Sequence, residues 1–425
     1  MKQRKGRKWR TLENAAKIFP SNSHGADTKV FRYTCQLTEP VDPAVLQRAV
    51  DEILPEFPGF TSVLRQGFFW YYLEESDRRI LVEPESEPLC APLYKDSQSA
   101  LLRVVYFDRR FSFEMFHVLA DGTGAMQFFK ALVCRYLSIA HAEELGGRLV
   151  LPDYDASIAQ RMDDGYARYY DKNALRKKPP AGPKAAHLKL EKRLDHRMTI
   201  MEGRLPLAEL KKQAKAHGAT ITIFLSAVLI QALAEQMPLS ELKKPVMLSV
   251  PVDLRGFFPS ETCRNFFSVF EAGSPAGPDT PLEEIIANVR ADFERRLVKD
   301  HFAARLARLA AMERNPIMRI VPLQVKNIVL YMAYRKSEEA YTAAFSNVGR
   351  IVLPEELHPW IEAASACNAT GKILLIGTTF GETVCLSFTS AYHSADVQRA
   401  FFTRLTRMGI PITITTNEPG EVTLP

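Results

Sequence analysis

Strand-like and helix-like stretches alternate along this chain, and the alternation occurs twice, before and after a polar stretch near the middle. Residues 151–190 are rich in charge and contain the basic run KKPPAGPK, a composition typical of a connection between lobes. The length of 425 residues exceeds the roughly 150 residues that one domain needs. We therefore predict an α/β (α+β) fold with a first lobe at 1–150, a connection at 151–190 and a second lobe at 191–425.

The first lobe opens with a strand-like run, KVFRYTCQL, which is followed by a helix with a marked start. Asp42 supplies an N-cap and Pro43 the first helical position. Further strands are predicted at FTSVL, FFWYYLEE, LLRVVYFD and RFSFEMFH, before a helix at AMQFFKALVCRYLSIA. In the second lobe we expect strands at 198–205, VMLSVPVDLR, RNFFSVFEA, AAFSNVGRIVL, IEAASACN, KILLIGTTF and ETVCLSFTSA, and helices at 206–217, 220–236, 281–311, 316–334 and 394–408.

The positive charge of the chain is concentrated at its N-terminus. The first ten residues, MKQRKGRKWR, contain six Lys and Arg residues and no acidic residue, against a net charge of +6 for the whole chain. The remaining body is nearly neutral, which argues against a nucleic-acid-binding protein, because such a protein spreads basic residues over the surface that meets the phosphates. We expect the arm at 1–10 to be a solvated tail; contact with an anionic surface or an acidic partner is the alternative.

The cysteines and the hydropathy pattern bear on metal sites and compartment. The six cysteines lie at least 18 residues apart, so neither zinc-ligand nor C-x-x-C spacing occurs, and we expect no metal site. No apolar segment follows the basic arm as in a secretion signal, so we expect reduced thiols and a cytoplasmic protein. The uncharged stretch 219–234 has 16 residues, fewer than the roughly 20 that a membrane span requires. It is predicted as a buried helix.

One histidine stands out by its position between a strand and a turn. His117 follows the strand-like RFSFEMF and begins HVLADG, which places a candidate general base four residues before Asp121. Gly122 comes next and permits a tight turn from strand to helix. The alternative for His117 is a core histidine whose hydrogen bonds are satisfied within the protein.

The sequence lacks the motifs of three other common classes of nucleotide-binding or catalytic site. The run DGTGAMQ is similar to a dinucleotide-binding turn, but Gln127 stands where the third glycine belongs, and no series of parallel strands and helices surrounds it. Neither the G-x-S-x-G elbow of serine hydrolases nor a P-loop occurs in the sequence. Serine hydrolase and phosphoryl-transfer chemistry therefore lack their motifs.

His117, Asp121 and Gly122 resemble the HxxxDG motif of the chloramphenicol acetyltransferase-like superfamily, which includes alcohol acetyltransferases, plant BAHD acyltransferases and condensation domains. The resemblance extends in order to TEPVDPAVLQRAVDEILPEFPGF, SVPVDLRGFFPSETCRNFFSVF and AFSNVGRIVLP. It implies two lobes of similar fold that meet at a channel, with the motif histidine at its middle. It also implies acyl transfer as the activity.

Two departures narrow the resemblance. Phe116 precedes the histidine where condensation domains usually carry a second histidine, which makes peptide-bond synthesis a poorer match. The DFGWG segment of plant BAHD enzymes is absent. The chain is most similar to stand-alone bacterial alcohol acetyltransferases and polyketide-associated acyltransferases.

The resemblance implies roles for particular residues. His117 would be the general base, and no acyl-enzyme is required because a thioester is already activated. Asp121 would be structural and would pair with an arginine, for which Arg255 in PVDLR is the match; an exposed charge after a strand is the alternative for Arg255. The candidates for oxyanion stabilisation or substrate binding are Asn265, Ser346 and Asn347, with a turn or sheet-end hydrogen bond as the alternative for each.

Three functions follow as hypotheses. The leading one is an acyl-CoA-dependent O- or N-acyltransferase that takes acyl-CoA as co-substrate and binds no other cofactor. The second is transfer from an acyl carrier protein, for which the basic arm and the run ALRKKPPAGPK could contact an acidic carrier. The third is a non-catalytic binding protein on the same fold. The acceptor, the acyl length and the oligomeric state stay open.

Overall fold

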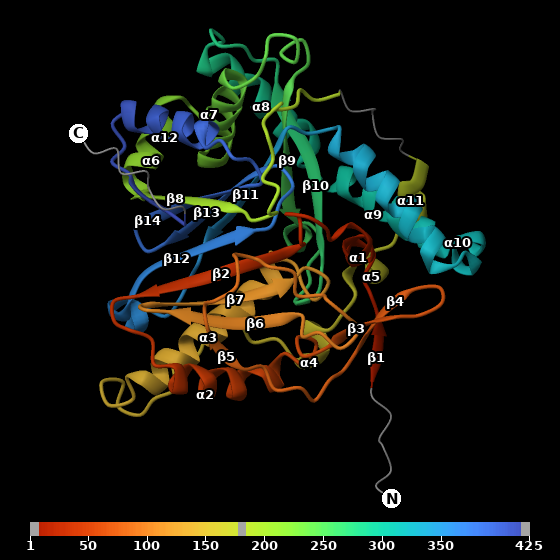
Figure 1. Cartoon of the computed structure of the whole chain (residues 1–425), viewed down its shortest axis with the longest axis vertical. Helices are drawn as coiled ribbons and strands as arrows, with labels where there is room; N and C mark the ends of the chain where they lie inside the picture. Colours follow the sequence, from red (N-terminus) through yellow and green to blue (C-terminus); the bar gives the residue numbers. More distant parts are fainter. Residues whose placement is uncertain (1–7, 177–183, 418–425) are drawn as a thin grey trace, which may run out of the picture.

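Three sheets organise the chain, which a computed structural model describes at residues 8–176 and 184–417 (Figure 1). A five-stranded sheet has the order β12-β2-β7-β6-β5, a seven-stranded sheet the order β10-β9-β11-β13-β14-β8-β15, and a small sheet the order β1-β4-β3. Helices cover both larger sheets, which confirms the predicted two-lobed α/β organisation. The proline-containing run at 177–183 lies outside the described residues.

The first lobe is built on the five-stranded sheet. Its strands are β2 (Val30–Leu37), β5 (Val82–Pro84), β6 (Leu102–Phe107), β7 (Arg110–Phe116) and β12 (Ile361–Asn368), and its helices are α2 (Pro43–Ile53) and α3 (Gly122–Ala140). Phe31, Tyr33 and Cys35 alternate with polar residues along β2 and join the apolar core with α2 and α3. The Asp42 carboxylate accepts hydrogen bonds from the first backbone N–H groups of α2, so the predicted cap is confirmed.

The second lobe is built on the seven-stranded sheet. Its strands are β8 (Thr199–Pro206), β9 (Val246–Asp253), β10 (Phe267–Ser274), β11 (Ala343–Arg350), β13 (Ile373–Phe380), β14 (Thr383–Ser390) and β15 (Thr413–Thr416), with helices α6 (Leu207–Ala216), α7 (Ile221–Glu235), α8 (Leu282–Arg296) and α12 (Asp396–Arg407). Helix α7 is buried along most of its length, which explains its uncharged sequence. The β9–β10 pair ends with Asp253 opposite Phe267, so residues 254–266 form a loop at one end of that pair.

One strand from the second half of the chain completes the first sheet. Strand β12 lies within the predicted second lobe, yet it pairs antiparallel with β2, with Cys367 opposite Arg32. The hydroxyl groups of Thr378 and Thr389, on β13 and β14, donate hydrogen bonds to β12 carbonyls at 3.0 and 2.8 Å. Strand β12 therefore ties the two lobes together, and the boundary at 190 does not separate the two sheets. The sequence pattern identified the strand but contained no information about its partner.

The predicted connection is packed where the structure describes it. It contains α4 (Ile158–Arg161), α5 (Gly165–Arg168) and a 3₁₀ turn at Lys172–Arg176. The Tyr154 hydroxyl donates to the carbonyl of Glu261 at 2.7 Å, and the Tyr166 hydroxyl donates to the carbonyl of Phe267 at 2.5 Å. This segment therefore supports the 254–266 loop from outside.

The long helices predicted in the second lobe are each divided. The region 281–311 forms α8 and then α9 (Lys299–Arg314), while 316–334 forms α10 (Pro316–Ile320) and α11 (Leu323–Glu338). Pro322 separates the last two, because proline has no N–H to continue the hydrogen bonds of α10.

The end of the basic arm is a strand instead of the predicted solvated tail. Strand β1 (Trp9–Thr11) pairs with β4 (Tyr71–Glu74), which also pairs with β3 (Val63–Gln66). The Arg10 guanidinium donates to the carbonyl of Gly59 at 3.1 Å. Residues 1–7 lie outside the described residues.

The cysteines are free thiols, and the apolar helices can be compared with the length that a membrane span requires. All six cysteines are buried and form no disulfide. Within residues 8–176 and 184–417, no single helix has the length and apolar character to cross a membrane, and only α6 and α7 together, with a bend of 79° between them, meet those two criteria.

Candidate active site

The candidate base, His117, directly follows β7 at the end of the five-stranded sheet. Its backbone N–H donates to the carbonyl of Lys29 at 2.8 Å, which extends the pairing of β7 with β2 by one residue. The rings of Phe19, Phe31 and Phe267 surround the imidazole, with centroids 4.5, 5.1 and 5.4 Å from its own. Phe267 belongs to β10, so both lobes contribute to this aromatic wall.

Burial and one amide decide the protonation of His117. Burial lowers the pKa of His117 below its usual value, although the negative charge of Asp121 acts in the opposite direction. The Asn265 Nδ2 group donates to the carbonyl of His117 at 3.0 Å, which turns its Oδ1 toward the imidazole Nδ1 at 3.1 Å. Because that oxygen can only accept, Nδ1 carries the proton. The lone pair of the neutral imidazole is therefore on Nε2.

Asp121 is fully occupied by donors other than the histidine. Its Oδ1 accepts from the backbone N–H of Gly124 at 2.8 Å and so caps α3, and its Oδ2 accepts from the backbone N–H of Phe266 at 2.7 Å. The Arg255 guanidinium binds both oxygens, at 2.9 and 3.1 Å. No hydrogen bond joins Asp121 to His117 in the part of the chain that the structure describes. The predicted pair with Arg255 is thus present.

Arg255 links this pair to the loop that carries Asn265. Its guanidinium donates to the carbonyls of Thr262 and Arg264, each at 2.8 Å from Nη2. Burial would lower the pKa of Arg255, but the neighbouring carboxylates, Asp121 first among them, raise it above its usual value. Arg255 is therefore always positively charged. Its hydrogen bonds fix the backbone on either side of Cys263, two residues before Asn265, whose amide contacts His117.

The two glycines of the turn have different roles. A Cβ atom on Gly124 would lie 2.0 Å from the carbonyl oxygen of Cys263, which no side chain can tolerate. A Cβ atom on Gly122 would meet only the Tyr33 hydroxyl, at 3.3 Å. Gly122 has no positive φ, so the turn does not require a glycine at this position for its backbone conformation. Gly124 is required for a different reason, because its missing side chain lets α3 approach the second lobe.

The other two candidates for oxyanion stabilisation lie on β11. Asn347 donates from Nδ2 to the Thr222 hydroxyl at 2.9 Å and accepts from the backbone N–H of Gly349 at 3.1 Å. Ser346 is opposite Ile376 in the parallel pairing with β13. Among the residues that the structure describes, no hydrogen bond connects Ser346 or Asn347 with His117. Of the three candidates, only Asn265 contacts the base, and both polar atoms of its amide are engaged there.

Several site residues were missed by sequence reasoning. The aromatic residues Phe19, Phe31 and Phe267 carry no motif, and only Phe267 stood in a segment singled out for its resemblance. A buried ion pair between Glu13 and Arg264 also fixes the loop next to Asn265. The N–F–F spacing after Arg264 was visible in the sequence, but nothing in it indicated which side chain would face the histidine.

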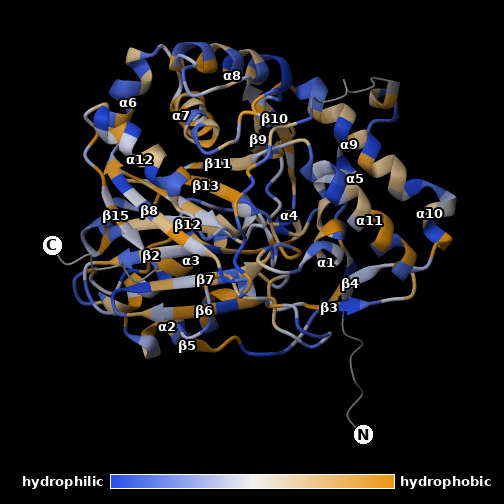
Figure 2. Ribbon diagram, turned by 45° about the horizontal axis from the view of Figure 1, so that its top comes forward, coloured by the Kyte–Doolittle hydropathy of each residue, from blue (hydrophilic) through white to orange (hydrophobic). Residues whose placement is uncertain are grey.

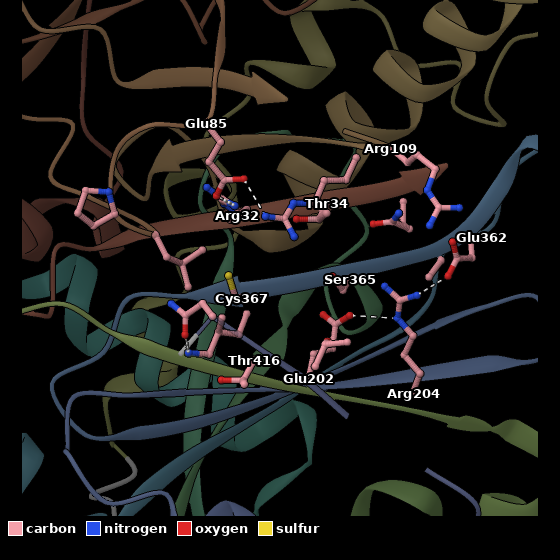
Figure 3. Close-up of a pocket in the computed structure, with 18 of the residues that line it drawn as sticks. Arg32, Thr34, Glu85, Arg109, Glu202, Arg204, Glu362, Ser365, Cys367 and Thr416 are labelled. Carbon is pink, nitrogen blue, oxygen red and sulfur yellow. Dashed lines mark hydrogen bonds and ion pairs between the residues drawn. The ribbon is translucent and has the colours of Figure 1, made fainter. Parts of the chain in front are cut away.

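A polar cavity of about 560 Å³ lies between the five-stranded sheet and the β8–β15 edge of the seven-stranded sheet (Figure 3). Arg32 pairs with Glu85, and Arg204 with Glu362, each at 2.7 Å, so its charged walls are largely compensated. His117 does not line this cavity, and we assign the candidate chemistry to the histidine and not to the cavity. Within the described ranges, no group of three His, Cys, Asp or Glu side chains is placed to hold a metal ion.

Comparison with known proteins identifies the fold that contains this site. The sequence matches no family model and no curated protein. Polyketide synthase associated protein 5 from Mycobacterium tuberculosis is similar over 93% of this chain and 96% of its own, with 17% identity and a TM-score of 0.56. TRI3 trichothecene 15-O-acetyltransferase from Fusarium sporotrichioides is similar over 94% of both chains, with 12% identity and a TM-score of 0.59.

Condensation domains are similar as well. A variant of the starter condensation domain of rhizomide synthetase RzmA, in complex with C8-CoA, is similar over 94% of both chains, with 12% identity and a TM-score of 0.62. These similarities cover both lobes. The chain therefore has the two-lobed chloramphenicol acetyltransferase-like fold that the motif around His117 predicted.

Proposed function

We propose that this protein transfers an acyl group from an acyl-CoA thioester to an alcohol or amine, with His117 as general base. The pairing of His117 with Asn265 carries the proposal, because it commits Nδ1 to the amide at 3.1 Å and leaves the lone pair on Nε2. The lowered pKa of His117 keeps that lone pair free of a proton at neutral pH. Most buried polar side-chain atoms are hydrogen-bonded, whereas Nε2 of His117 accepts no hydrogen bond within the described residues.

The reaction needs one proton acceptor and no acyl-enzyme. Nε2 takes the proton of the acceptor hydroxyl or amine as its oxygen or nitrogen attacks the thioester carbonyl. The tetrahedral intermediate then collapses, the C–S bond breaks, and the leaving thiolate takes the proton back from Nε2. The products are an ester or amide and free CoA, and the imidazole ends in its starting state.

The nearby thiol is a poor alternative nucleophile, which supports direct transfer. Cys263 lies in the loop next to Asn265, but burial raises the pKa of its thiol to about 11. The sulfur is also in contact with the Tyr154 hydroxyl, at 3.2 Å. At neutral pH this thiol is protonated, and the thiolate is the form that attacks thioesters.

The similar structures guide the choice of donor and acceptor. The RzmA domain is a complex with C8-CoA, and TRI3 is an O-acetyltransferase. A donor on a carrier protein is a second candidate, because several similar structures, among them the first condensation domain of the CDA synthetase, are condensation domains. The missing second histidine at Phe116 favours the CoA donor.

A panel of acyl-CoA thioesters crossed with alcohols and amines tests the proposal by the release of free thiol. We expect acceptor-dependent release for at least one pair, and loss of that release in His117→Ala. Release from a loaded acyl carrier protein but from no CoA thioester would select the second candidate. Thiol release in neither format, with a folded protein, would contradict acyl transfer.

A further inference from the structure

Helix α11 presents an apolar face to solvent. Val325, Ile328, Val329 and Met332 occupy successive turns of one side of the helix and are 49%, 61%, 52% and 64% exposed. Their spacing of three and four residues is the pattern that normally faces a core. The opposite side of α11 already packs on the protein, through Leu323 among others, so this helix is apolar on two sides.

The apolar surface continues onto neighbouring elements. Ile320 of α10 is 71% exposed, and Phe68, at the tip of the β3–β4 hairpin, is 69% exposed. The tip is held against α11, because the Leu323 N–H donates to the carbonyl of Phe68 and the buried Lys326 ammonium to the carbonyl of Phe69, both at 2.9 Å. Phe68, Ile320, Val325, Ile328, Val329 and Met332 are called the α10–α11 face below. Figure 2 shows hydrophobic colour along α11 at the edge of the molecule.

Exposed cations lie at both ends of this face. Five Lys and Arg residues lie between 314 and 337, and Glu338, which follows this stretch, forms an ion pair with Arg335 at 3.3 Å. Arg319, Arg335 and Lys336 of α10 and α11 are exposed, and the sequence has no Asp or Glu from 314 to 337. Exposed apolar side chains scattered singly are ordinary, but a contiguous patch inside a cationic segment is not.

We propose that the α10–α11 face binds the surface of an anionic lipid bilayer. Isoleucine, methionine and phenylalanine side chains insert at the boundary between headgroups and acyl chains, and the flanking Arg and Lys side chains contact anionic headgroups. An acidic protein partner would satisfy the charge, and Gln324 and Tyr331 of α11 are exposed as well, but acidic side chains would leave the six exposed apolar side chains without a counterpart. A bilayer satisfies both the apolar area and the charge.

The face lies close to the candidate active site. Helix α11 packs against α1 (Phe19–Asn22), and the Phe19 ring contacts His117. The Tyr331 ring of α11 is also 5.4 Å from that of His24. A bound bilayer would therefore lie beside the segment that leads to the base. The binding itself does not depend on the proposed acyl transfer and is measured without substrate.

Co-sedimentation of the full chain with vesicles tests the proposal. We expect binding to phosphatidylglycerol vesicles, at least about tenfold weaker binding to phosphatidylcholine vesicles, and weakening of the former with salt. The double variant Ile328→Glu with Met332→Glu should lose at least about tenfold of the binding, since each side chain contributes buried apolar area. Arg335→Glu with Lys336→Glu should remove most of the preference for the anionic lipid.

Matched controls separate this face from general surface effects. Leu239 is 78% exposed outside the face, and Lys211 and Lys215 are exposed on α6. Leu239→Glu, and Lys211→Glu with Lys215→Glu, should leave vesicle binding within about twofold of the parent, because these residues lie outside the face. Thermal unfolding of every variant checks that it is folded.

Three results would overturn the proposal. One is equal sedimentation with anionic and neutral vesicles. Another is unchanged binding in the Ile328→Glu, Met332→Glu variant. The third is a lipid-free dimer, or a lipid-free complex with an acidic carrier protein, that the same variant abolishes in sedimentation-velocity measurements, since the face would then be a protein interface.

Discussion

His117 and Asp121 stand only four residues apart at the two ends of the HVLAD segment, yet the polar groups of these two side chains are hydrogen-bonded very differently. At one end, both oxygens of Asp121 are filled by two backbone N–H groups and by Arg255. At the other end, Asn265 engages Nδ1 of His117, and among the described residues no hydrogen bond reaches Nε2. Both ends contact the same loop of the second lobe, at 254–266.

The comparison separates a group that holds the lobes from a group that can do chemistry. A carboxylate whose acceptor sites are all used cannot also orient a histidine or accept a proton from a substrate. An imidazole held at one nitrogen keeps a fixed direction for the other. We therefore expect changes at the Asp121 end to act on stability first, and changes at the His117 end to act on rate first.

Removing the base should have the largest effect. His117→Ala should lower kcat by about 10²–10⁴-fold, the range for loss of a general base, with little change in the melting temperature. Steady-state kinetics and thermal unfolding measure the two quantities, and His393→Ala, at an exposed position, is the control. A kcat within a few-fold of the parent would mean that His117 is not the base, and that it does not differ from Asp121 in its effect on rate.

Breaking the ion pair should come next. Arg255→Gln should reduce the free energy of unfolding by about 3–5 kcal/mol, because it leaves the buried Asp121 carboxylate without its charged partner. Asp121→Asn should cost less, because Arg255 keeps its ion pair with Asp253 at 2.7 Å. The double variant should be no less stable than the weaker single variant. Chemical denaturation of all four proteins gives the cycle, and additive losses would mean that the two side chains do not interact. Retained stability with a selective loss of kcat in Asp121→Asn would mean that Asp121 orients the base.

Substitution of Gly124 and Gly122 should have a smaller effect, and it tests the contact between α3 and the 254–266 loop. Gly124→Ala should cost about 1–3 kcal/mol of stability, because its Cβ atom overlaps the Cys263 carbonyl and displaces the loop. Activity should also fall, since Asn265 lies two residues beyond. Gly122→Ala is the matched control and should cost less, because its Cβ atom meets only a hydroxyl at 3.3 Å. Equal losses in the two variants would contradict the close approach of α3 to the second lobe.

The smallest effect expected is a shift in pH dependence. In the parent, kcat/KM should fall as the pH drops through the lowered pKa of His117, with a midpoint below about 6.5, because only the neutral imidazole accepts a proton. Asn265→Asp should raise that midpoint by about 1–3 pH units, since a carboxylate at Nδ1 stabilises the imidazolium. Asn288→Asp, whose amide binds Ser274 on another part of the lobe, should leave the midpoint unchanged. An unchanged midpoint in Asn265→Asp would mean that the amide does not control the base.

The sequence predicted the elements and the turn better than the contacts between segments. The N-cap at Asp42, the buried helix at 219–234 and the pair of Asp121 with Arg255 all followed from local patterns or from the resemblance, and the structure contains them. The first two features depend on residues that are close in sequence. The third depends on two segments, HVLADG and PVDLR, that the resemblance had already matched.

The remaining features depend on contacts over long sequence distances. Strand β12 joins the first sheet from more than 300 residues away, and alternation of apolar residues cannot identify a partner strand. Asn265 was a candidate for oxyanion stabilisation, whereas its amide is occupied by the base. The aromatic wall of Phe19 and Phe267 comes from two distant segments, and no spacing rule connects them.

The central claim is that Nε2 of His117 is the free proton acceptor of the site. Nitrogen NMR of protein labelled at histidine, with His117→Ala used for assignment, reports the protonation of each ring nitrogen across a pH titration. We expect a neutral imidazole with its proton on Nδ1 at pH 7, and protonation of Nε2 only below the usual histidine range. A proton on Nε2 at neutral pH, or titration above that range, would contradict it.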